Sequence, residues 1–208
     1  MNTLSYSLGK QLSYLPPHNL SLFSNEVHLK EKNEINNHSF QDKIYLFCYG
    51  SNSLEQLKER VKNDNLEAFK AYLPGYVRIF AGYSKKWNGG VATLMKTQLN
   101  HGTKGSIVQL SEYELQKVDK FEGSLKDATP YGRVNNVYYR KHIKVKNEKN
   151  EEISCVVYLR NNTTWVETPS MSYLEAIKKN LLPFWFDLDE NNKIIIYDEY
   201  LNKIDEYH

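Results

Sequence analysis

The chain has little of what several protein classes depend on. It contains two cysteines among 208 residues, its formal net charge is only +2, and no apolar stretch is long enough to cross a membrane. The small net charge gives no electrostatic reason to expect a nucleic acid partner, and the lack of a long apolar stretch argues against a membrane partner. No Cys/His cluster has metal-ligand spacing, and neither a phosphate-loop signature nor an internal repeat occurs, so no metal or other cofactor is predicted.

The two cysteines indicate a compartment. Cys48 and Cys155 each lie in an apolar run that is typical of a strand. In such a run a small buried thiol is far more common than a metal ligand or a nucleophile. We therefore expect free, buried cysteines and a reducing environment, the cytoplasm.

The beginning of the chain differs in composition from the rest. Residues 1–42 are rich in Ser, Asn and Leu, and they contain no acidic residue before Glu26. This composition predicts a flexible N-terminal extension, followed by one domain over residues 43–208. An organelle-targeting peptide is the alternative, but the stretch lacks Arg, and Lys10 is its only lysine before residue 29.

The clearest local pattern is a helix start at Ser111. Ser111 is a good N-cap, and Glu114, three residues later, completes a capping box. Leu110 and Leu115 are spaced as a hydrophobic staple across this start. The helix is predicted to end at Gly123, because glycine readily adopts the left-handed conformation of a C-cap.

One carboxylate falls on the apolar side of this helix. The stripe runs through Leu115, Val118 and Glu122, so Glu122 is predicted to face inward. A partly desolvated carboxylate at the negative end of a helix dipole holds a proton more readily, which suits a general base near neutral pH. Two alternatives stay open: Glu122 pairs with a nearby Arg or Lys, or Phe121 is the inward residue and Glu122 lies at the surface.

A second candidate feature is the turn Tyr49-Gly50-Ser51-Asn52. It directly follows the apolar run 44–48 and precedes an amphipathic segment. A strand that turns through Gly50 into a helix N-terminus directs backbone N–H groups outward, where the helix dipole favours negative charge. The turn is therefore a candidate site for a carboxylate or an oxyanion, and an ordinary strand-to-helix connection is the alternative.

The order of the expected elements indicates the fold class. Strands are predicted at 44–48, 67–82 with a break at 74–75, 91–96, 105–110, 137–146 and 152–160, and helices at 53–61, 111–122 and 170–182. Strand and helix do not alternate regularly, which argues against a doubly wound sheet. The pattern predicts an α+β fold, with a mixed, mostly β barrel-like sheet and a few flanking helices.

These motifs together resemble the γ-glutamylcyclotransferase family, within the AIG2-like superfamily. The resemblance runs from Ile44 to Leu181 and rests on the order and spacing of several segments: 49–52, Trp87 to Leu94, Val118 to Gly123, Tyr138 to Arg140, Cys155 to Leu159 and Thr168 to Tyr173. It implies a closed, mixed barrel. It also implies that Glu122, at the end of its helix, is the catalytic residue.

The resemblance further implies a set of substrate-binding residues and no metal. They are Leu46, Phe47, Cys48, Tyr49, Gly50, Ser51, Tyr138 and Tyr173. For two of them a purely structural role is the alternative. The charged strand that begins at Tyr138 reads as a mostly solvated face, and Tyr173 alone would be a helix-face tyrosine covering the barrel end.

The activity implied by the resemblance is cyclisation of a γ-glutamyl group to 5-oxoproline with release of an amino acid, a lyase-type intramolecular acyl transfer in glutathione metabolism. The implied partner is thus a small γ-glutamyl compound. Relatives that act on γ-glutamylamines, or specifically on glutathione, tend to carry a leucine-like residue after Tyr-Gly-Ser. Asn52 therefore favours γ-glutamyl amino acids as substrates.

Two other functions remain as alternatives. One is a γ-glutamylamine cyclotransferase acting on γ-glutamyl-lysine isopeptide, and the other is a non-catalytic barrel that binds a small metabolite. Glu122 argues against the second, because a binding module has no need to bury an unpaired carboxylate. The stretch Pro183 to Phe186 departs from the family pattern, so the resemblance does not predict the rim of the pocket or its specificity on the acceptor side. The sequence also leaves open whether the protein is a monomer or a homodimer.

Overall fold

The computed structural model describes residues 43–97, 101–124, 137–160 and 166–185, together with the backbones of two strands at 194–197 and 203–207. The predicted N-terminal extension over residues 1–42 lies outside the described residues. Within the described part, no helix is both long and apolar enough to cross a membrane. No group of three or more His, Cys, Asp or Glu side chains in that part is placed to hold a metal ion.

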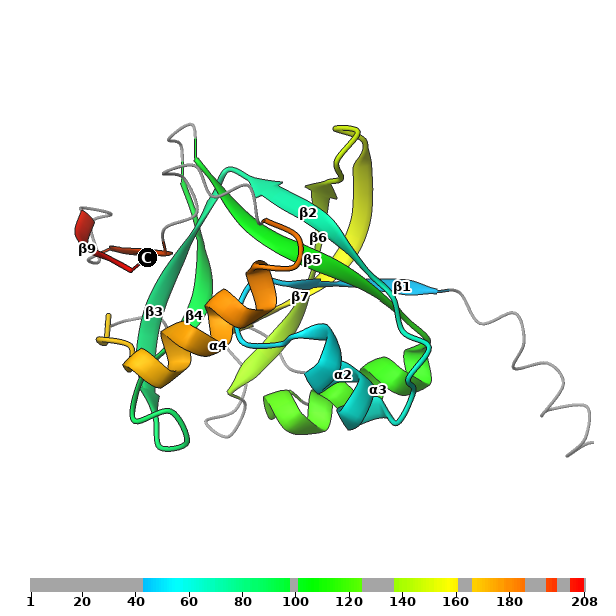
Figure 1. Cartoon of the computed structure of the whole chain (residues 1–208), viewed down its shortest axis with the longest axis horizontal. Helices are drawn as coiled ribbons and strands as arrows, with labels where there is room; N and C mark the ends of the chain where they lie inside the picture. Colours follow the sequence, from blue (N-terminus) through cyan, green and yellow to red (C-terminus); the bar gives the residue numbers. More distant parts are fainter. Residues whose placement is uncertain are drawn as a thin grey trace, which may run out of the picture. The chain divides into compact units, whose positions relative to one another are not determined.

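Five strands close into a barrel (Figure 1). In order around the barrel they are β1 (Ile44–Cys48), β5 (Gly102–Leu110), β2 (Ala68–Pro74), β6 (Tyr138–Lys146) and β7 (Glu152–Arg160). All neighbours are antiparallel except β1 and β7, which close the barrel in parallel with Leu46 paired to Val156. The predicted α+β fold with a barrel-like sheet is confirmed.

Three helices and two smaller ribbons complete the described fold. The helices are α2 (Leu54–Val61), α3 (Glu112–Glu122) and α4 (Met171–Leu181). The ribbons are β3 (Tyr76–Ser84) with β4 (Gly89–Lys96), and β8 (Ile194–Tyr197) with β9 (Lys203–Tyr207). Figure 1 shows α2 and α3 side by side. Helix α4 contacts β5, and Tyr173 near its start contacts Phe80 of β3 and Ala92 of β4.

Several strand boundaries differ from the sequence prediction, mostly at glycines. β4 begins at Gly89 and β5 at Gly102, earlier than predicted. The sequence gives no strand signal at these positions, because glycine is depleted in strands. β3 runs on past Gly82, which has a φ of +63° at the point where its register shifts against β4. The ribbon of β8 and β9 was not predicted, since its sequence shows no alternation strong enough to separate it from a polar tail.

The alternation of β1 divides its side chains between two cores. Leu46 and Cys48 pack in the cluster beneath α2 and α3, whereas Phe47 and Tyr49 belong to the cluster inside the barrel that α4 covers. Both cysteines of the chain are free and buried, as predicted, and Cys155 lies in the barrel cluster. The end of β1 therefore sends alternate side chains toward the barrel interior.

Helix α3 begins and ends as the sequence predicts. The Ser111 hydroxyl accepts a hydrogen bond from the Glu114 N–H at 3.3 Å, and the Glu114 carboxylate accepts one from the Ser111 N–H at 2.8 Å. Leu110 and Leu115 are both buried in the same cluster. Gly123 ends the helix with a φ of 60°, so that Glu122 is its last residue.

Candidate active site

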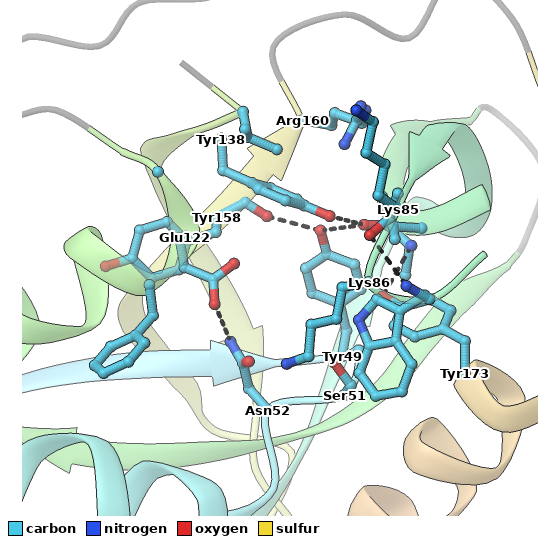
Figure 2. Close-up of a pocket in the computed structure, with 18 of the residues that line it drawn as sticks. Tyr49, Ser51, Asn52, Lys85, Lys86, Glu122, Tyr138, Tyr158, Arg160 and Tyr173 are labelled. Carbon is cyan, nitrogen blue, oxygen red and sulfur yellow. Dashed lines mark hydrogen bonds between the residues drawn. The ribbon is translucent and has the colours of Figure 1, made fainter. Parts of the chain in front are cut away.

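A cavity of about 470 Å³ lies where the end of β1 meets the end of α3 (Figure 2). Its wall is formed by the turn after β1, the last residues of α3, the loop between β3 and β4, and side chains from β6, β7 and α4. This volume is in the range of pockets that hold small molecules. The two features singled out in the sequence, the turn 49–52 and Glu122, both line it.

Buried side chains fix the backbone of the turn through its carbonyl groups. Arg78 donates from Nε to the Tyr49 carbonyl at 2.8 Å, and Asn180 donates from Nδ2 to the Gly50 carbonyl at 2.8 Å. Asn180 is almost wholly buried, so it holds the turn from within the protein. The turn is thus rigid before any ligand arrives.

The N–H groups of the same turn remain available. Among the described residues, none accepts a hydrogen bond from the N–H of Gly50, Ser51 or Asn52. These donors precede α2, whose N-cap is Ser53, so they lie at the positive end of a helix. A Cβ at Gly50 would lie 3.4 Å from the Tyr173 hydroxyl, so glycine leaves space beside the backbone that a larger side chain would fill.

Glu122 lies beside this turn and is held by two side chains, one of them from the turn itself. Its Oε1 accepts hydrogen bonds from Arg60 Nη1 at 3.0 Å and from Asn52 Nδ2 at 3.2 Å. Arg60 also donates to Asn52 Oδ1 at 3.0 Å, so the three groups form a closed triangle. No described residue contacts Glu122 Oε2 with a hydrogen bond, which leaves that oxygen free to accept a proton.

This geometry corrects part of the sequence analysis. Glu122 is not an unpaired carboxylate, so the argument against a binding module on that ground is wrong. The alternative in which Glu122 pairs with a basic residue is the observed one. The alternative in which Phe121 faces inward is wrong, because 60% of Phe121 is exposed, whereas only 13% of the Glu122 side chain is.

Three tyrosine hydroxyls meet at the backbone of Ala92. Tyr138 donates to its carbonyl at 3.2 Å, and the Tyr173 hydroxyl accepts from its N–H at 3.0 Å. The Tyr49 hydroxyl lies 3.4 Å from the same carbonyl and donates to the Tyr158 carbonyl at 2.7 Å. Burial raises the pKa of the Tyr49 and Tyr138 hydroxyls well above the ordinary value and that of Tyr173 to about 12. All three stay protonated near neutral pH, and Glu122 is the one carboxylate among the described residues that line the cavity.

The structure brings together most of the predicted substrate-binding residues. Those whose atoms line the cavity are Phe47, Tyr49, Gly50, Ser51, Tyr138 and Tyr173. Leu46 and Cys48 do not reach it, because the alternation of β1 turns their side chains beneath α2 and α3. Burial also raises the pKa of the Cys48 thiol, which keeps it from acting as a nucleophile.

Several cavity residues were missed by the sequence analysis. They are Arg60, Tyr158, Lys85, Lys86, Lys120 and Arg160. Arg60 looks like any basic residue on the exposed face of a short helix, and only the packing of α2 against α3 brings it to Glu122. The lysine pair 85–86 stands directly before the Trp87 motif, which is the one sequence feature that pointed toward it.

Comparison with known families agrees with this geometry. Residues 46–175 match the family described as "Gamma-glutamyl cyclotransferase, AIG2-like". The chain belongs to this family. The match includes the turn, Glu122, Tyr138 and Tyr173, so the cavity of this AIG2-like protein is built from the part of the chain that defines the family.

Solved structures with a similar fold support the assignment. A structure titled "Gamma-glutamyl cyclotransferase" is 26% identical with a TM-score of 0.56, and the match covers 68% of this chain and 82% of that one. The human protein loc79017 is also 26% identical with a TM-score of 0.56, over 70% of this chain and 85% of its own. YkqA from Bacillus subtilis, 19% identical with a TM-score of 0.52 over 73% and 52% of the two chains, shares the fold. No curated protein sequence matches the chain. The family and these neighbours indicate an enzyme of the γ-glutamyl cyclotransferase type.

Proposed function

We propose that this protein is a γ-glutamylcyclotransferase that converts γ-glutamyl amino acids into 5-oxoproline and the free amino acid. One observation carries the proposal. Glu122, whose Oε2 is free, and the turn 50–52, whose N–H groups are unpaired among the described residues, line one cavity, so a base and a set of anion-binding donors are available to a single small substrate.

The substrate brings its own nucleophile. The α-amine of a γ-glutamyl compound attacks the γ-carbonyl carbon of the same residue, a C–N bond closes the five-membered ring, and the amide C–N bond to the leaving amine breaks. No water is consumed. Holding the substrate folded makes the attack unimolecular, which supplies much of the rate enhancement.

Glu122 moves the proton in this scheme. Oε2 of its carboxylate takes a proton from the α-ammonium group so that the amine can attack, and the protonated acid then gives this proton to the departing nitrogen. The ring nitrogen loses a second proton to solvent as the ring closes, and the departing amine takes one up from solvent to leave as an ammonium group. Arg60 and Asn52 hold Oε1, so the carboxylate keeps one orientation through both steps. The neighbouring tyrosine hydroxyls, with raised pKa values, do not compete for the proton.

The turn stabilises negative charge. The N–H groups of Gly50 and Ser51 donate to the substrate α-carboxylate or to the oxyanion that forms on the γ-carbonyl, and the start of α2 adds its dipole. Because Arg78 and Asn180 hold the turn through its carbonyls, these donors need no reorganisation when charge develops.

Asn52 supports the choice of γ-glutamyl amino acids within the family. Its amide donates to Glu122 and accepts from Arg60, so a leucine-like residue at this position would remove one hydrogen-bond partner from each of the two charged groups and leave them only each other. A site built around Asn52 is therefore different in polarity from one built around leucine at the point where the reacting amine must lie.

Release of 5-oxoproline tests the proposal directly. We expect γ-glutamylalanine to be turned over, whereas α-glutamylalanine, whose amine lies at the wrong distance from the scissile carbonyl, and N-acetyl-γ-glutamylalanine should give no product. γ-Glutamyl-lysine isopeptide and glutathione complete the panel. A marked preference for the isopeptide would move the protein to the γ-glutamylamine branch. Folded protein that turns over no γ-glutamyl compound would instead be the metabolite-binding barrel.

A further inference from the structure

The charge of the cavity is far more positive than the proposed reaction alone requires. Among the described residues that line it, five are basic and one is acidic. Arg60 is paired with Glu122. Lys85, Lys86, Lys120 and Arg160 have no ion-pair partner within the described part of the chain.

Arg160, the last residue of β7, is built into the wall. Its Nε is buried and has no hydrogen-bond partner among the described groups. Gly82 makes the room for it, since a Cβ at that position would lie 2.5 Å from Arg160 Nε. The guanidinium lies 6.0 Å from the ring centroid of Tyr138. A buried donor without a partner is costly, and it is explained when a ligand supplies the acceptor.

This guanidinium lies away from the reacting end of the cavity. Figure 2 shows Arg160 and Lys85 on one side of Tyr138, with Glu122 and Asn52 on the other. A glutamyl group bound at the turn 50–52 and Glu122 therefore leaves the Arg160 side for the rest of the substrate. Lys86 lies between these two sides in the same view, with its Nζ 5.0 Å from the Trp87 ring centroid.

We propose that Arg160, assisted by Lys85 and Lys86, binds a carboxylate carried by the leaving group. The site then selects γ-glutamyl compounds whose leaving amine is an amino acid with a free carboxylate, over those whose leaving group is neutral at that end. Arginine suits this task because its planar guanidinium forms paired hydrogen bonds with a carboxylate. The inference rests on the proposed function in one respect, because that function places the glutamyl part of the ligand at Glu122.

Ligand binding to a catalytically inactive variant tests this inference. Calorimetry on the Glu122→Gln protein compares γ-glutamylalanine with γ-glutamylalaninamide, which differ only in the carboxylate of the leaving group. We expect the amide to bind about 10- to 100-fold more weakly, the range for losing a hydrogen bond to a charged group. Adding Arg160→Gln should abolish that discrimination by weakening γ-glutamylalanine alone, and Arg160→Lys should restore part of it.

Controls separate a local effect from a general one. Lys144→Gln removes one positive charge from the exposed face of β6, outside the cavity, and should leave the discrimination intact. If Arg160→Gln weakens both ligands equally, or if the parent protein binds both equally or neither, the inference is wrong. If Arg160→Gln does not fold, Lys86→Gln takes its place with a smaller expected loss of discrimination.

Release of 5-oxoproline by the protein with Glu122 intact is measured in parallel, because the two proposals fail differently. Discrimination between the ligands without any product would overturn the proposed function and keep the carboxylate site. Product without discrimination would keep the function and overturn the carboxylate site.

Discussion

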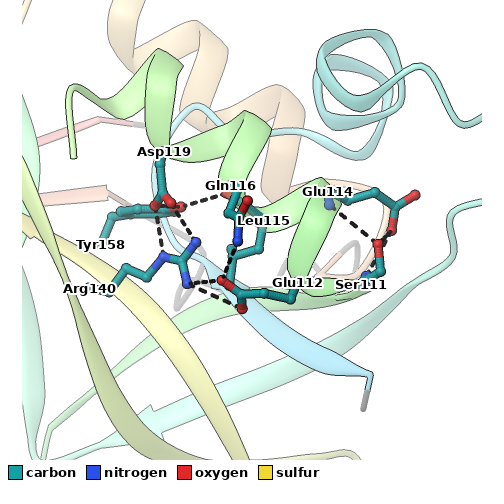
Figure 3. Close-up of polar contacts among 8 residues, drawn as sticks. All are labelled: Ser111, Glu112, Glu114, Leu115, Gln116, Asp119, Arg140 and Tyr158. Carbon is teal, nitrogen blue, oxygen red and sulfur yellow. Dashed lines mark hydrogen bonds and ion pairs between the residues drawn. The ribbon is translucent and has the colours of Figure 1, made fainter. Parts of the chain in front are cut away.

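Asp119 on α3 and Arg140 on β6 face each other through two hydrogen bonds (Figure 3). Arg140 Nε donates to Asp119 Oδ1 at 2.7 Å, and Nη2 donates to Oδ2 at 2.5 Å. The Tyr158 hydroxyl donates to the same carboxylate at 2.7 Å, and the Tyr158 carbonyl accepts from the Tyr49 hydroxyl at 2.7 Å. This polar chain fixes α3, and with it Glu122, to the strands that form the cavity wall.

Breaking this link should cost considerable stability. Asp119→Ala leaves the Arg140 guanidinium and the Tyr158 hydroxyl without their shared partner, so the free energy of unfolding is expected to fall by about 3 kcal/mol, as for a buried pair that loses one member. Urea unfolding followed by circular dichroism measures it. The matched control is Lys144→Ala, which breaks a pair with Glu152 whose side chains are 67% and 59% exposed, and should have a far smaller effect on stability. Equal losses in the two variants would contradict the structural role of Asp119.

Glu122→Gln tests the base. Glutamine keeps the volume of the side chain and an oxygen for Arg60 and Asn52, but it cannot take up a proton, so turnover of γ-glutamylalanine should fall by about 100-fold or more. Affinity for 5-oxoproline should change little. Asp119→Asn is the matched control, because it removes a charge from the same helix at a position that does not line the cavity. Asp119→Asn should lower the free energy of unfolding but leave the turnover of the folded protein nearly unchanged. Near wild-type turnover in Glu122→Gln would show that Glu122 is not the base.

The parts of the fold that the sequence predicted are those that depend on local chemistry. The start of α3 at Ser111 and its end at Gly123 need only a capping box and a left-handed glycine. The hairpin of β6 and β7 follows from alternation on both sides of the polar turn 147–150. The position of Glu122 at a helix end follows from the same local rules.

The partners of those residues were not predictable, because they come from packing between distant segments. Glu122 meets Arg60, 62 positions earlier, only because α2 lies against α3. Alternation placed Arg140 on an outer face of β6 that we expected to be mostly solvated, but it says nothing of what covers that face. Asp119 of α3 lies over it, and the Arg140 side chain is only 25% exposed.

The capping box predicts a specific pH dependence of stability. Partial burial alone would raise the pKa of the Glu114 carboxyl, but hydrogen bonds from the Ser111 N–H, the Asn63 amide and the Ser111 hydroxyl lower it below the ordinary value. A carboxyl with a lowered pKa in the folded state stabilises the fold above its unfolded pKa of about 4.3, and this contribution is lost as the pH falls through the lower folded value.

Comparison of the wild type with Glu114→Gln measures this contribution. The difference in free energy of unfolding should be about 0.5–1 kcal/mol at pH 7, the size of a charge effect at a helix N-terminus, and should shrink as the pH is lowered from about 5 to 3. A difference that stays constant over this range would show that the Glu114 charge is not involved.

Gly50→Val tests the turn as the binding site. The φ of Gly50 is not positive, so valine is not excluded by backbone conformation, and the effect should come from the space that its side chain occupies. The new Cβ would lie 3.4 Å from the Tyr173 hydroxyl and 3.7 Å from the Ala92 Cβ, with the added methyl groups in the region where a ligand must approach the N–H donors. We expect binding of 5-oxoproline to weaken at least about tenfold, equivalent to about 1.4 kcal/mol, while Gly50→Ala gives a smaller loss.

Calorimetry on protein whose folding is confirmed by circular dichroism measures both variants. Unchanged affinity in folded Gly50→Val would place the ligand elsewhere in the cavity. A folded Gly50→Ala protein with lower stability and unchanged affinity would show that the glycine serves packing alone.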